Sequence, residues 1–294
     1  VGLTGGGLAQ VVDQPFEHFP SSRAPRMLPT GGSSFVSSTC GPSGGRVMRL
    51  ADGADKELWK GADCVRAMQW VGDDLLMGVN DDVLWASTQT SLGGALGSQV
   101  LAISDDGGWV GTTDGLFALE QGHWRREGGV LGPVAALARG EDGVLWVGSG
   151  NGLHRRDGAT WTRWGPEEGM ASTPIRAVWP HEDGAWAGSY GSGLFHVGPA
   201  GVTSLTTANG LSENIASAII ADDQGYLWML GNRGVSRVAV SELESFAEGA
   251  LDGVRCRLFR AGEGDGGTQP AGALVDGHVF MPTVDGMVAF DVAS

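Results

Sequence analysis

The side chains best suited to holding a ligand lie in short glycine-rich segments that recur along the chain. An aromatic ring offers a flat apolar face to a sugar, and a guanidinium donates paired hydrogen bonds to a polar group. Tyr190 and Arg233 supply these two groups, and both are larger than a tight turn requires. With the polar residues at the same place in other segments, the candidate binding residues are Asp114, Asn151, Tyr190, Asn232, Arg233 and Asp285. The alternative is that they are solvated turn residues, since Asn and Asp form turns in their own right.

Known catalytic and metal-binding motifs are absent from the sequence. It contains no H-E-x-x-H or P-loop motif and no C-x-x-C pair. The 6 histidines are scattered, and the adjacent acids Glu167 and Glu168, and Glu182 and Asp183, are typical of solvated loops. We therefore expect no catalytic residue, no metal and no cofactor. An enzyme stays open as an alternative because distant segments can assemble a site that sequence spacing does not reveal.

Composition and charge restrict the class of partner. A formal net charge of -15, with only 19 Lys and Arg, is opposite to what a nucleic-acid backbone attracts, so we expect no nucleic acid. No apolar run is long enough to insert directly into a membrane. Of the 3 cysteines, Cys40 and Cys64 could pair in an oxidising compartment or remain free thiols like Cys256.

One pattern recurs along the chain at intervals of about forty residues, which is typical of repeat architectures. Its clearest copy is residues 208–238, ANGLSENIASAIIADDQGYLWMLGNRGVSRV, in which short apolar runs are separated by glycine turns. Such a unit cannot bury both of its faces alone, so it needs neighbours of its own kind. The aromatic or apolar anchors of the copies stand at positions 35, 76, 109, 146, 186, 228 and 280.

Four short strands per unit predict an all-β fold, a β-propeller with four antiparallel strands in each blade. We label the strands A to D from the axis to the rim. The A-strand candidates are residues 24–29, 64–69, 99–104, 133–139, 174–180, 215–221 and 269–274. This set predicts seven blades in a single domain over residues 1–294, which we expect to be a piece of a longer protein. Residues 16–19 would complete the last blade beside residues 288–291 and so remove its exposed edge.

One short helix is predicted near residues 241–249. Ser241 and Glu244 have capping-box spacing, and Gly249 is placed as a C-terminal stop. Leu243 and Phe246 are three residues apart and would pack on the blade below.

The tryptophans and the A–B turns have structural explanations. Trp146, Trp186 and Trp228 recur at one phase of the repeat and are predicted to wedge between blades. Six others either pack under outer strands or offer a stacking surface to a sugar: Trp59, Trp70, Trp85, Trp161, Trp164 and Trp179. The pairs between strands A and B suit hairpins that need positive φ, and they are Asp106-Gly107, Asp142-Gly143, Asp183-Gly184, Gln224-Gly225 and Asp276-Gly277.

The same residues resemble a known family, the propeller repeat of two-component regulators. Residues 210–215, GLSENI, followed by residues 222–228, DDQGYLW, are similar to its G-L-S-x-N-x-V and D-x-x-G-x-L-W pattern. Residues 264–291 resemble the last blade of these sensors, which precedes a triple-tyrosine immunoglobulin-like domain. The resemblance is strong from Trp109 onward and weaker before Val100.

The resemblance implies a non-catalytic sensor in the periplasm or elsewhere outside the cytoplasm, within a two-component signalling regulator. It further implies a small-molecule signal, often an oligosaccharide, and a homodimer is an open alternative. Two other functions remain open from the residues alone. One is a stand-alone propeller enzyme such as a lyase resembling the streptogramin lyases, and the other is a protein-interaction scaffold.

Overall fold

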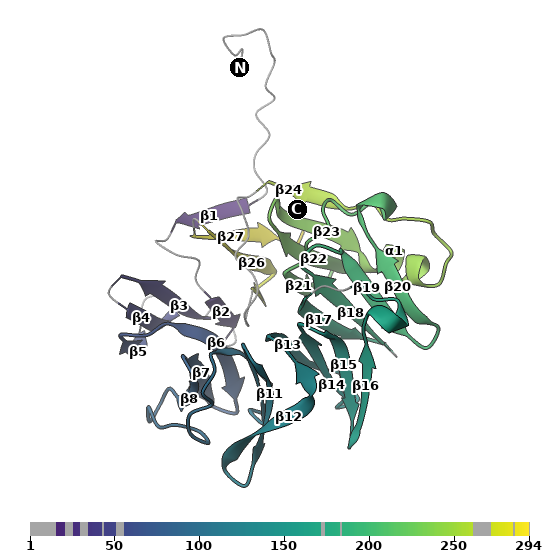
Figure 1. Cartoon of the computed structure of the whole chain (residues 1–294). Helices are drawn as coiled ribbons and strands as arrows, with labels where there is room; N and C mark the ends of the chain where they lie inside the picture. Colours follow the sequence, from purple (N-terminus) through teal and green to yellow (C-terminus); the bar gives the residue numbers. More distant parts are fainter. Residues whose placement is uncertain are drawn as a thin grey trace, which may run out of the picture.

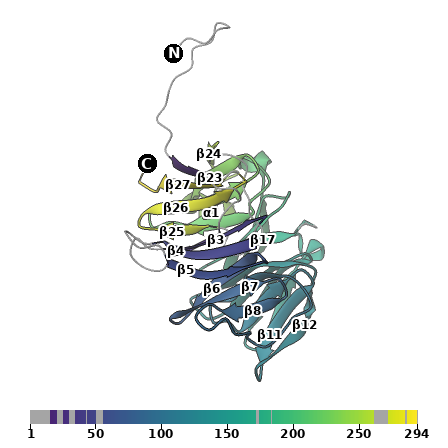
Figure 2. The same cartoon turned by 90° about the vertical axis from the view of Figure 1, so that its left-hand side faces the viewer.

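The computed structural model is a ring of antiparallel sheets around a central axis (Figure 1). It describes residues 16–20, 26–29, 35–42, 44–50, 56–171, 174–182, 184–260, 272–284 and 286–293. Within these residues there are seven sheets, one for each blade, and the A strands of successive blades contact one another around the axis. Figure 2 shows the sheets of blades 7, 1 and 2 following one another along the ring. The predicted seven-bladed, all-β propeller is confirmed.

The first four blades use the chain in order. Blade 1 contains β2 (Arg26–Pro29), β3 (Phe35–Gly41), β4 (Gly44–Leu50) and β5 (Lys56–Gly61). Blade 2 contains β6 (Val65–Val71), β7 (Asp74–Val79) and β8 (Asp82–Trp85). Blade 3 contains β9 (Val100–Ile103), β10 (Trp109–Thr112), β11 (Gly115–Glu120) and β12 (His123–Leu131). Blade 4 contains β13 (Val134–Arg139), β14 (Leu145–Ser149), β15 (Gly152–Asp157) and β16 (Thr160–Trp164).

The last three blades follow the same order, and the final one borrows a strand from the start of the chain. Blade 5 contains β17 (Ile175–His181), β18 (Gly184–Ser189), β19 (Leu194–Gly198) and β20 (Gly201–Leu205). Blade 6 contains β21 (Ala218–Ala221), β22 (Tyr226–Gly231), β23 (Gly234–Ala239) and β24 (Arg257–Phe259). Blade 7 contains β25 (Ala273–Val275), β26 (His278–Thr283), β27 (Gly286–Asp291) and β1 (Phe16–Pro20).

Blade 2 departs from the predicted four strands per blade, because its sheet has three. After β8 the chain turns through Gly93, Gly94 and Gly97, which all have positive φ and cannot continue an extended outer strand. This segment still covers the blade, since Leu92 and Leu96 pack against the apolar cluster that contains Leu76 and Val83. The main-chain oxygen of Leu92 also accepts a hydrogen bond from Trp124 Nε1 of blade 3 at 2.6 Å.

The ring closes as predicted, with β1 as the outer strand of blade 7. Phe16 lies opposite Phe290 and Phe19 lies opposite Met287 in an antiparallel register. The outermost strand of the last blade thus comes from the other end of the chain, which leaves no free edge on β27.

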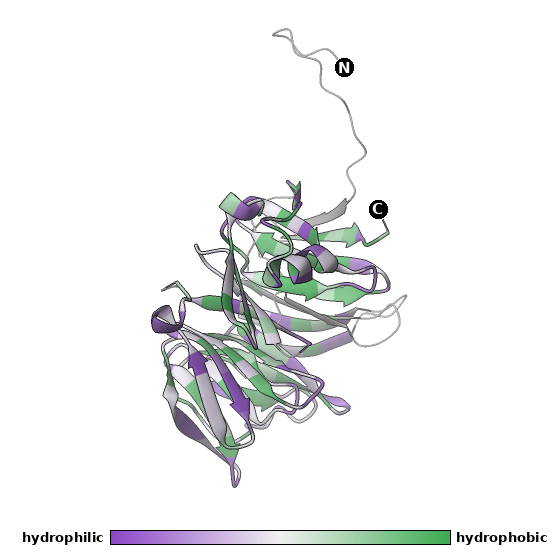
Figure 3. Ribbon diagram, turned by 90° about the vertical axis from the view of Figure 1, so that its right-hand side faces the viewer, coloured by the Kyte–Doolittle hydropathy of each residue, from purple (hydrophilic) through white to green (hydrophobic). Residues whose placement is uncertain are grey.

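Burial falls from the inner strands to the outer ones. All residues of β9, β10 and β14 are buried, whereas most residues of β12 and β16 are exposed or half-buried. In Figure 3 apolar residues concentrate along the strands, and hydrophilic residues are frequent at strand ends. Trp146, Trp186 and Trp228 are 4%, 1% and 0% exposed and join apolar clusters that span adjacent blades, so their predicted wedge role is confirmed.

The one α-helix in the described residues, α1 (Val240–Ala247), follows β23 directly. Leu243 and Phe246 are buried as predicted, and Gly249 ends the helix with a φ of 75°. The capping-box prediction is wrong, because Ser241 lies inside the helix and Ala239 is the N-cap residue. The main-chain nitrogen of Val240 donates to Gly225 O at 2.9 Å, so the hairpin of blade 6 fixes the helix start instead of a capping side chain.

A disulfide joins Cys40, near the B–C turn of blade 1, to Cys64, just before the A strand of blade 2. Their Cα atoms are 5.4 Å apart, within the ordinary range for a disulfide. The bond ties two neighbouring blades, and it settles an alternative that the sequence left open. Cys256 is a free, half-buried thiol.

Candidate functional site

The predicted binding residues that the structure describes lie on the face formed by the B–C turns and the D–A links. Tyr190 of blade 5 is 49% exposed, and its hydroxyl accepts a hydrogen bond from Asn232 Nδ2 of blade 6 at 3.2 Å. The guanidinium carbon of Arg176 lies 5.9 Å from the centroid of the Tyr190 ring. Tyr190 and Asn232 are therefore brought together across the boundary between two blades.

Arg233 acts within the same boundary but holds the backbone. Its guanidinium donates to Ser212 O at 2.9 Å, and its main-chain nitrogen donates to Glu213 Oε1 at 2.9 Å. Ser212 and Glu213 belong to the link that enters blade 6. These contacts attach the B–C turn to that link, so the longest side chain in the predicted set has a structural role.

The remaining predicted residues lie apart from Tyr190. Asn151 Oδ1 accepts hydrogen bonds from Leu131 N at 3.2 Å and Ser149 Oγ at 2.7 Å, so it is engaged inside the turn of blade 4. Asp114 lies in the turn of blade 3, where its main-chain oxygen accepts from Arg126 Nη2 at 2.6 Å. Asp285 lies outside the described residues.

Two cavities open on the opposite face, where the A–B turns lie, on either side of the turn after β17. The smaller cavity, about 260 Å³, lies between blade 5 and α1, and its lining includes His181, Trp186, His196, Thr203, Glu244 and Glu248. The larger cavity, about 810 Å³, lies between blades 4 and 5, and its lining includes Glu141, Asp142, Trp146, Arg155, Trp179 and Glu182. The same turn, with His181 and Glu182, borders both.

A row of cross-strand pairs builds the floor of the smaller cavity. Trp186 of β18 pairs with His196 of β19, and His196 pairs with Thr203 of β20; all three line this cavity. Trp179 of β17 pairs with Trp186 but lines the larger cavity. Because directly paired residues share one face of a sheet, these side chains line up across blade 5. The Trp186 and His196 rings are 4.8 Å apart, and Trp179 stacks on His181 at 4.3 Å.

Charge gathers at the mouth of this cavity. His181 Nε2 lies 2.9 Å from Glu244 Oε1 of α1, and Glu182 lies beside them. Burial lowers the pKa of His196 below its usual value, and the positive charge of nearby His181 lowers it further. The cavity therefore combines imidazoles with carboxylates, and such groups can bind cations or accept hydrogen bonds from a ligand.

The larger cavity has an aromatic floor with charged walls. Trp146 is buried and stacks on Trp164 with ring centroids 5.7 Å apart. The guanidinium carbon of Arg155 lies 6.0 Å from the Trp146 centroid, and Arg155 Nη2 is 3.0 Å from Asp157 Oδ2. Half-buried Trp179 borders the cavity from blade 5. Such a mixture of rings, carboxylates and a guanidinium is typical of pockets for polar small molecules.

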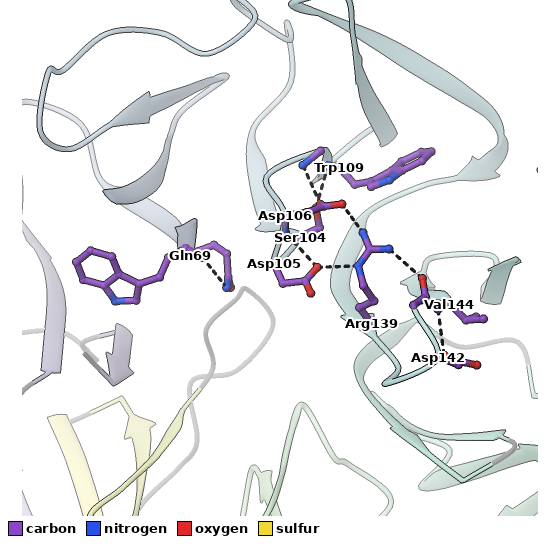
Figure 4. Close-up of polar contacts among 11 residues, drawn as sticks. Gln69, Ser104, Asp105, Asp106, Trp109, Arg139, Asp142 and Val144 are labelled. Atoms are coloured by element: carbon purple, nitrogen blue, oxygen red, sulfur yellow. Dashed lines mark hydrogen bonds and ion pairs between the residues drawn. The ribbon is translucent and has the colours of Figure 1, made fainter. Parts of the chain in front are cut away.

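Neighbouring A–B turns on this face are fastened to each other (Figure 4). Arg139 of blade 4 lies between two turns, with Nε 3.0 Å from Asp105 Oδ1 and a further ion pair to Asp106. Its Nη1 donates to Gly143 O at 2.9 Å in its own turn. Asp142 Oδ1 accepts from Val144 N at 3.0 Å, as a turn-forming carboxylate does. These contacts stiffen the face that carries the larger cavity.

The structure bears out the turn interpretation of the A–B residues with one exception. Gly107, Gly143, Gly225 and Gly277 have positive φ as predicted. In blade 5 the positive φ of 49° falls on Glu182 instead, one residue before Asp183, which lies outside the described residues. Positive φ is uncommon for a residue other than glycine, so the conformation of this turn is unusual.

Sequence reasoning chose the other face for the site and did not choose any residue of the cavities as a site residue. His181 and Glu244 are 63 residues apart, and only the packing of α1 against blade 5 brings them together. The available signals were Trp179, which is off the repeat phase, and the adjacent acids at 182 and 183. Among the described residues, no helix has the length and apolar character needed to cross a membrane.

Comparisons with known proteins give structural neighbours only. No family model matches the chain, and no curated protein matches it. The extracellular domain of BT3049 from B. thetaiotaomicron, described as a hybrid two-component system, is 16% identical with a TM-score of 0.68. The similarity covers 95% of this chain and 42% of that one. The extracellular domain of BT4673 from the same organism is 14% identical with a TM-score of 0.68, over 94% of this chain and 40% of that one.

A propeller of another class is also similar. The WD40 β-propeller domain of Doa1 is 11% identical with a TM-score of 0.64, over 93% of this chain and 94% of that one. This chain thus spans less than half of each sensor domain and nearly all of the WD40 domain. Because all the identities are low, what these likenesses show is a shared propeller fold.

Proposed function

We propose that this propeller is a non-catalytic, extracytoplasmic sensor module of a two-component regulator, and that it takes an oligosaccharide into the larger cavity. The observation that carries the proposal is the combination of Trp179, Arg155 and the carboxylates of Glu141 and Asp142 around one opening. Sugars bind where an aromatic face meets groups that can pair with adjacent hydroxyls.

Two further observations support the location and class. The structural neighbours include extracellular domains of proteins described as two-component systems. The disulfide between Cys40 and Cys64 fits an oxidising compartment, where such bonds persist.

The position of the cavity suits signalling without chemistry. It lies between blades 4 and 5, so a bound ligand contacts both blades at once. Such a ligand stabilises the arrangement of blades that it fits best. It shifts the equilibrium between two conformations by the difference in its affinity for them.

Calorimetry with a panel of oligosaccharides tests the proposal. We expect a binding sugar to lose at least tenfold in affinity in Trp179→Ala and in Arg155→Gln, with the fold of both variants checked by circular dichroism. Tyr190→Ala and Arg233→Ala on the opposite face serve as matched controls and should bind normally. Loss of binding in the controls alone would move the site to the B–C face. Absence of binding to every sugar would reject the ligand class.

A protein-interaction scaffold is the second candidate, and one observation favours it. Leu131, Tyr190 and Val284 are 53%, 49% and 48% exposed, and all three lie at B–C turns or D–A links. We propose a second copy of this chain as the partner on that face. Light scattering should then report a dimer that Leu131→Ser combined with Tyr190→Ser converts to a monomer. A monomeric wild-type protein would reject this candidate.

A further inference from the structure

We propose that His181, Glu182 and Glu244 form a binding site for a divalent cation of the zinc type. The imidazole nitrogen and the two carboxylates each offer one ligand atom, and these atoms all lie within 4.8 Å of one another. His181 Nε2 and Glu244 Oε1 are already 2.9 Å apart. The site lies at the mouth of the smaller cavity and does not depend on the proposed oligosaccharide.

The spacing fits a cation after a small adjustment. In a tetrahedral zinc site with bonds of about 2.0–2.2 Å, ligand atoms are ~3.4 Å apart. Glu182 is exposed and Glu244 is half-buried, so rotation about their side-chain bonds can bring the carboxylates inward. His181 is held in place because its ring stacks on Trp179 at 4.3 Å with an interplanar angle of 23°.

The ligands come from elements that the fold fixes independently. His181 is the last residue of β17, Glu182 follows it in the turn, and Glu244 lies on α1. The helix is anchored by two buried side chains close to Glu244: Leu243 directly before it and Phe246 two residues after it. The strand with its turn and the helix therefore bring possible metal-ligand atoms to one point.

The ligand types point to the class of cation. Imidazole is a ligand preferred by zinc and neighbouring transition metals, whereas calcium and magnesium favour oxygen ligands only. Three protein ligands leave a fourth position for water or a ligand group. That position would face the cavity of about 260 Å³, which His196 and Glu248 also line. A bound cation would also offset the repulsion between the two carboxylates.

Titration of the EDTA-treated protein with zinc chloride, followed by calorimetry and thermal shift, tests the proposal without any sugar. We expect one zinc ion per chain and a rise in Tm. His181→Ala, Glu182→Gln and Glu244→Gln should each weaken binding at least tenfold. His278→Ala is the matched control, because His278 is an exposed histidine in the corresponding hairpin of blade 7, next to Asp276.

The outcomes separate the site from an ordinary ion pair. If Glu182→Gln binds zinc as well as wild type while the other two variants do not, the three-ligand site is wrong. Unchanged affinity in all three variants, or no zinc binding to the wild type, also overturns it. Magnesium or calcium binding as tightly as zinc would overturn the assignment of cation class. Circular dichroism of each variant identifies a loss that is due to unfolding, and the near-isosteric Glu244→Gln guards against that ambiguity.

Discussion

His154 shows how a single side chain can be fixed in one charge state by its surroundings. It is 3% exposed, and its Nε2 lies 3.0 Å from Asn151 Oδ1 and 3.0 Å from Ser149 Oγ. Because the amide oxygen of Asn151 can only accept, Nε2 carries the proton of the neutral ring. Burial, followed by the positive charge of Arg163, lowers the pKa of His154 from 6.5 to about 4.

This lowered pKa predicts a pH dependence of stability. Below pH 6.5 the unfolded chain binds a proton at His154 while the folded chain does not, so the free energy of unfolding falls as pH drops toward about 4. The full loss is about 3 kcal/mol. Urea unfolding between pH 7.5 and 4.5 should show a smaller loss in His154→Gln than in wild type. Parallel curves for the two proteins would contradict the prediction.

Trp228 is a second residue whose contribution can be isolated. It is fully buried, its Nε1 donates to Asp222 Oδ2 at 2.6 Å, and its ring lies 5.4 Å from that of Phe290 in blade 7. We expect Trp228→Ala to cost about 3–5 kcal/mol, as for large buried aromatics in general. Trp228→Phe keeps a ring in the wedge and should cost less. Chemical denaturation measures both, and an Ala variant within error of wild type would refute the wedge.

At the scale of elements, the repeat pattern predicts most strands but not where each begins. The predicted A strand of blade 6 starts at residue 215, whereas β21 starts at Ala218, because Ile215 pairs with Tyr190 of the neighbouring blade. The main-chain nitrogen of Ala216 likewise donates to Ser189 O at 2.9 Å. These bonds between blades depend on the closed ring, so local sequence does not reveal them. The helix start at Val240 is hidden for a different reason, because it depends on a hydrogen bond to Gly225 O in the hairpin of the same blade.

The disulfide between blades 1 and 2 gives a prediction for a connection between elements. It closes a separation of 24 residues, and a crosslink over such a loop stabilises a chain by about 3 kcal/mol. Cys64→Ser should lose about this much in urea unfolding. Cys256→Ser is the matched control and should lose little, since Cys256 is a free thiol. Equal stability of wild type with and without reductant would contradict the prediction.

At the scale of the whole molecule, the number of blades and the ring closure could be predicted because each depends on a pattern repeated along the chain. The cavities could not, because they form between blades and between blade 5 and α1. Tyr190 and Arg233 stood out by size, yet the structure engages Arg233 with the backbone of the link. A binding role for the predicted set stays a prediction.

The closing strand allows a test of the whole ring. Replacing residues 16–20 by a Gly-Ser segment of the same length removes the backbone partner of β27. We expect a lower Tm, a loss on the order of 3 kcal/mol from several unmade hydrogen bonds, and association through the exposed edge. Calorimetry and size-exclusion chromatography measure these effects, and a peptide containing residues 16–20 should reverse them. An unchanged, monomeric variant would show that the ring does not need this strand.

The register of that closure also determines how the molecule responds to force. Phe16 faces Phe290 while Pro20 faces Gly286, so the outward ends of both strands lie at the same end of the pair. Tension between the two chain ends would load one hydrogen bond at a time, as in opening a zipper, and would not shear the whole ladder at once. The pairing of β1 with β27, which protects the ring against aggregation, is therefore its mechanically weakest connection. Under a pull on both ends, β1 would detach before any other blade opened.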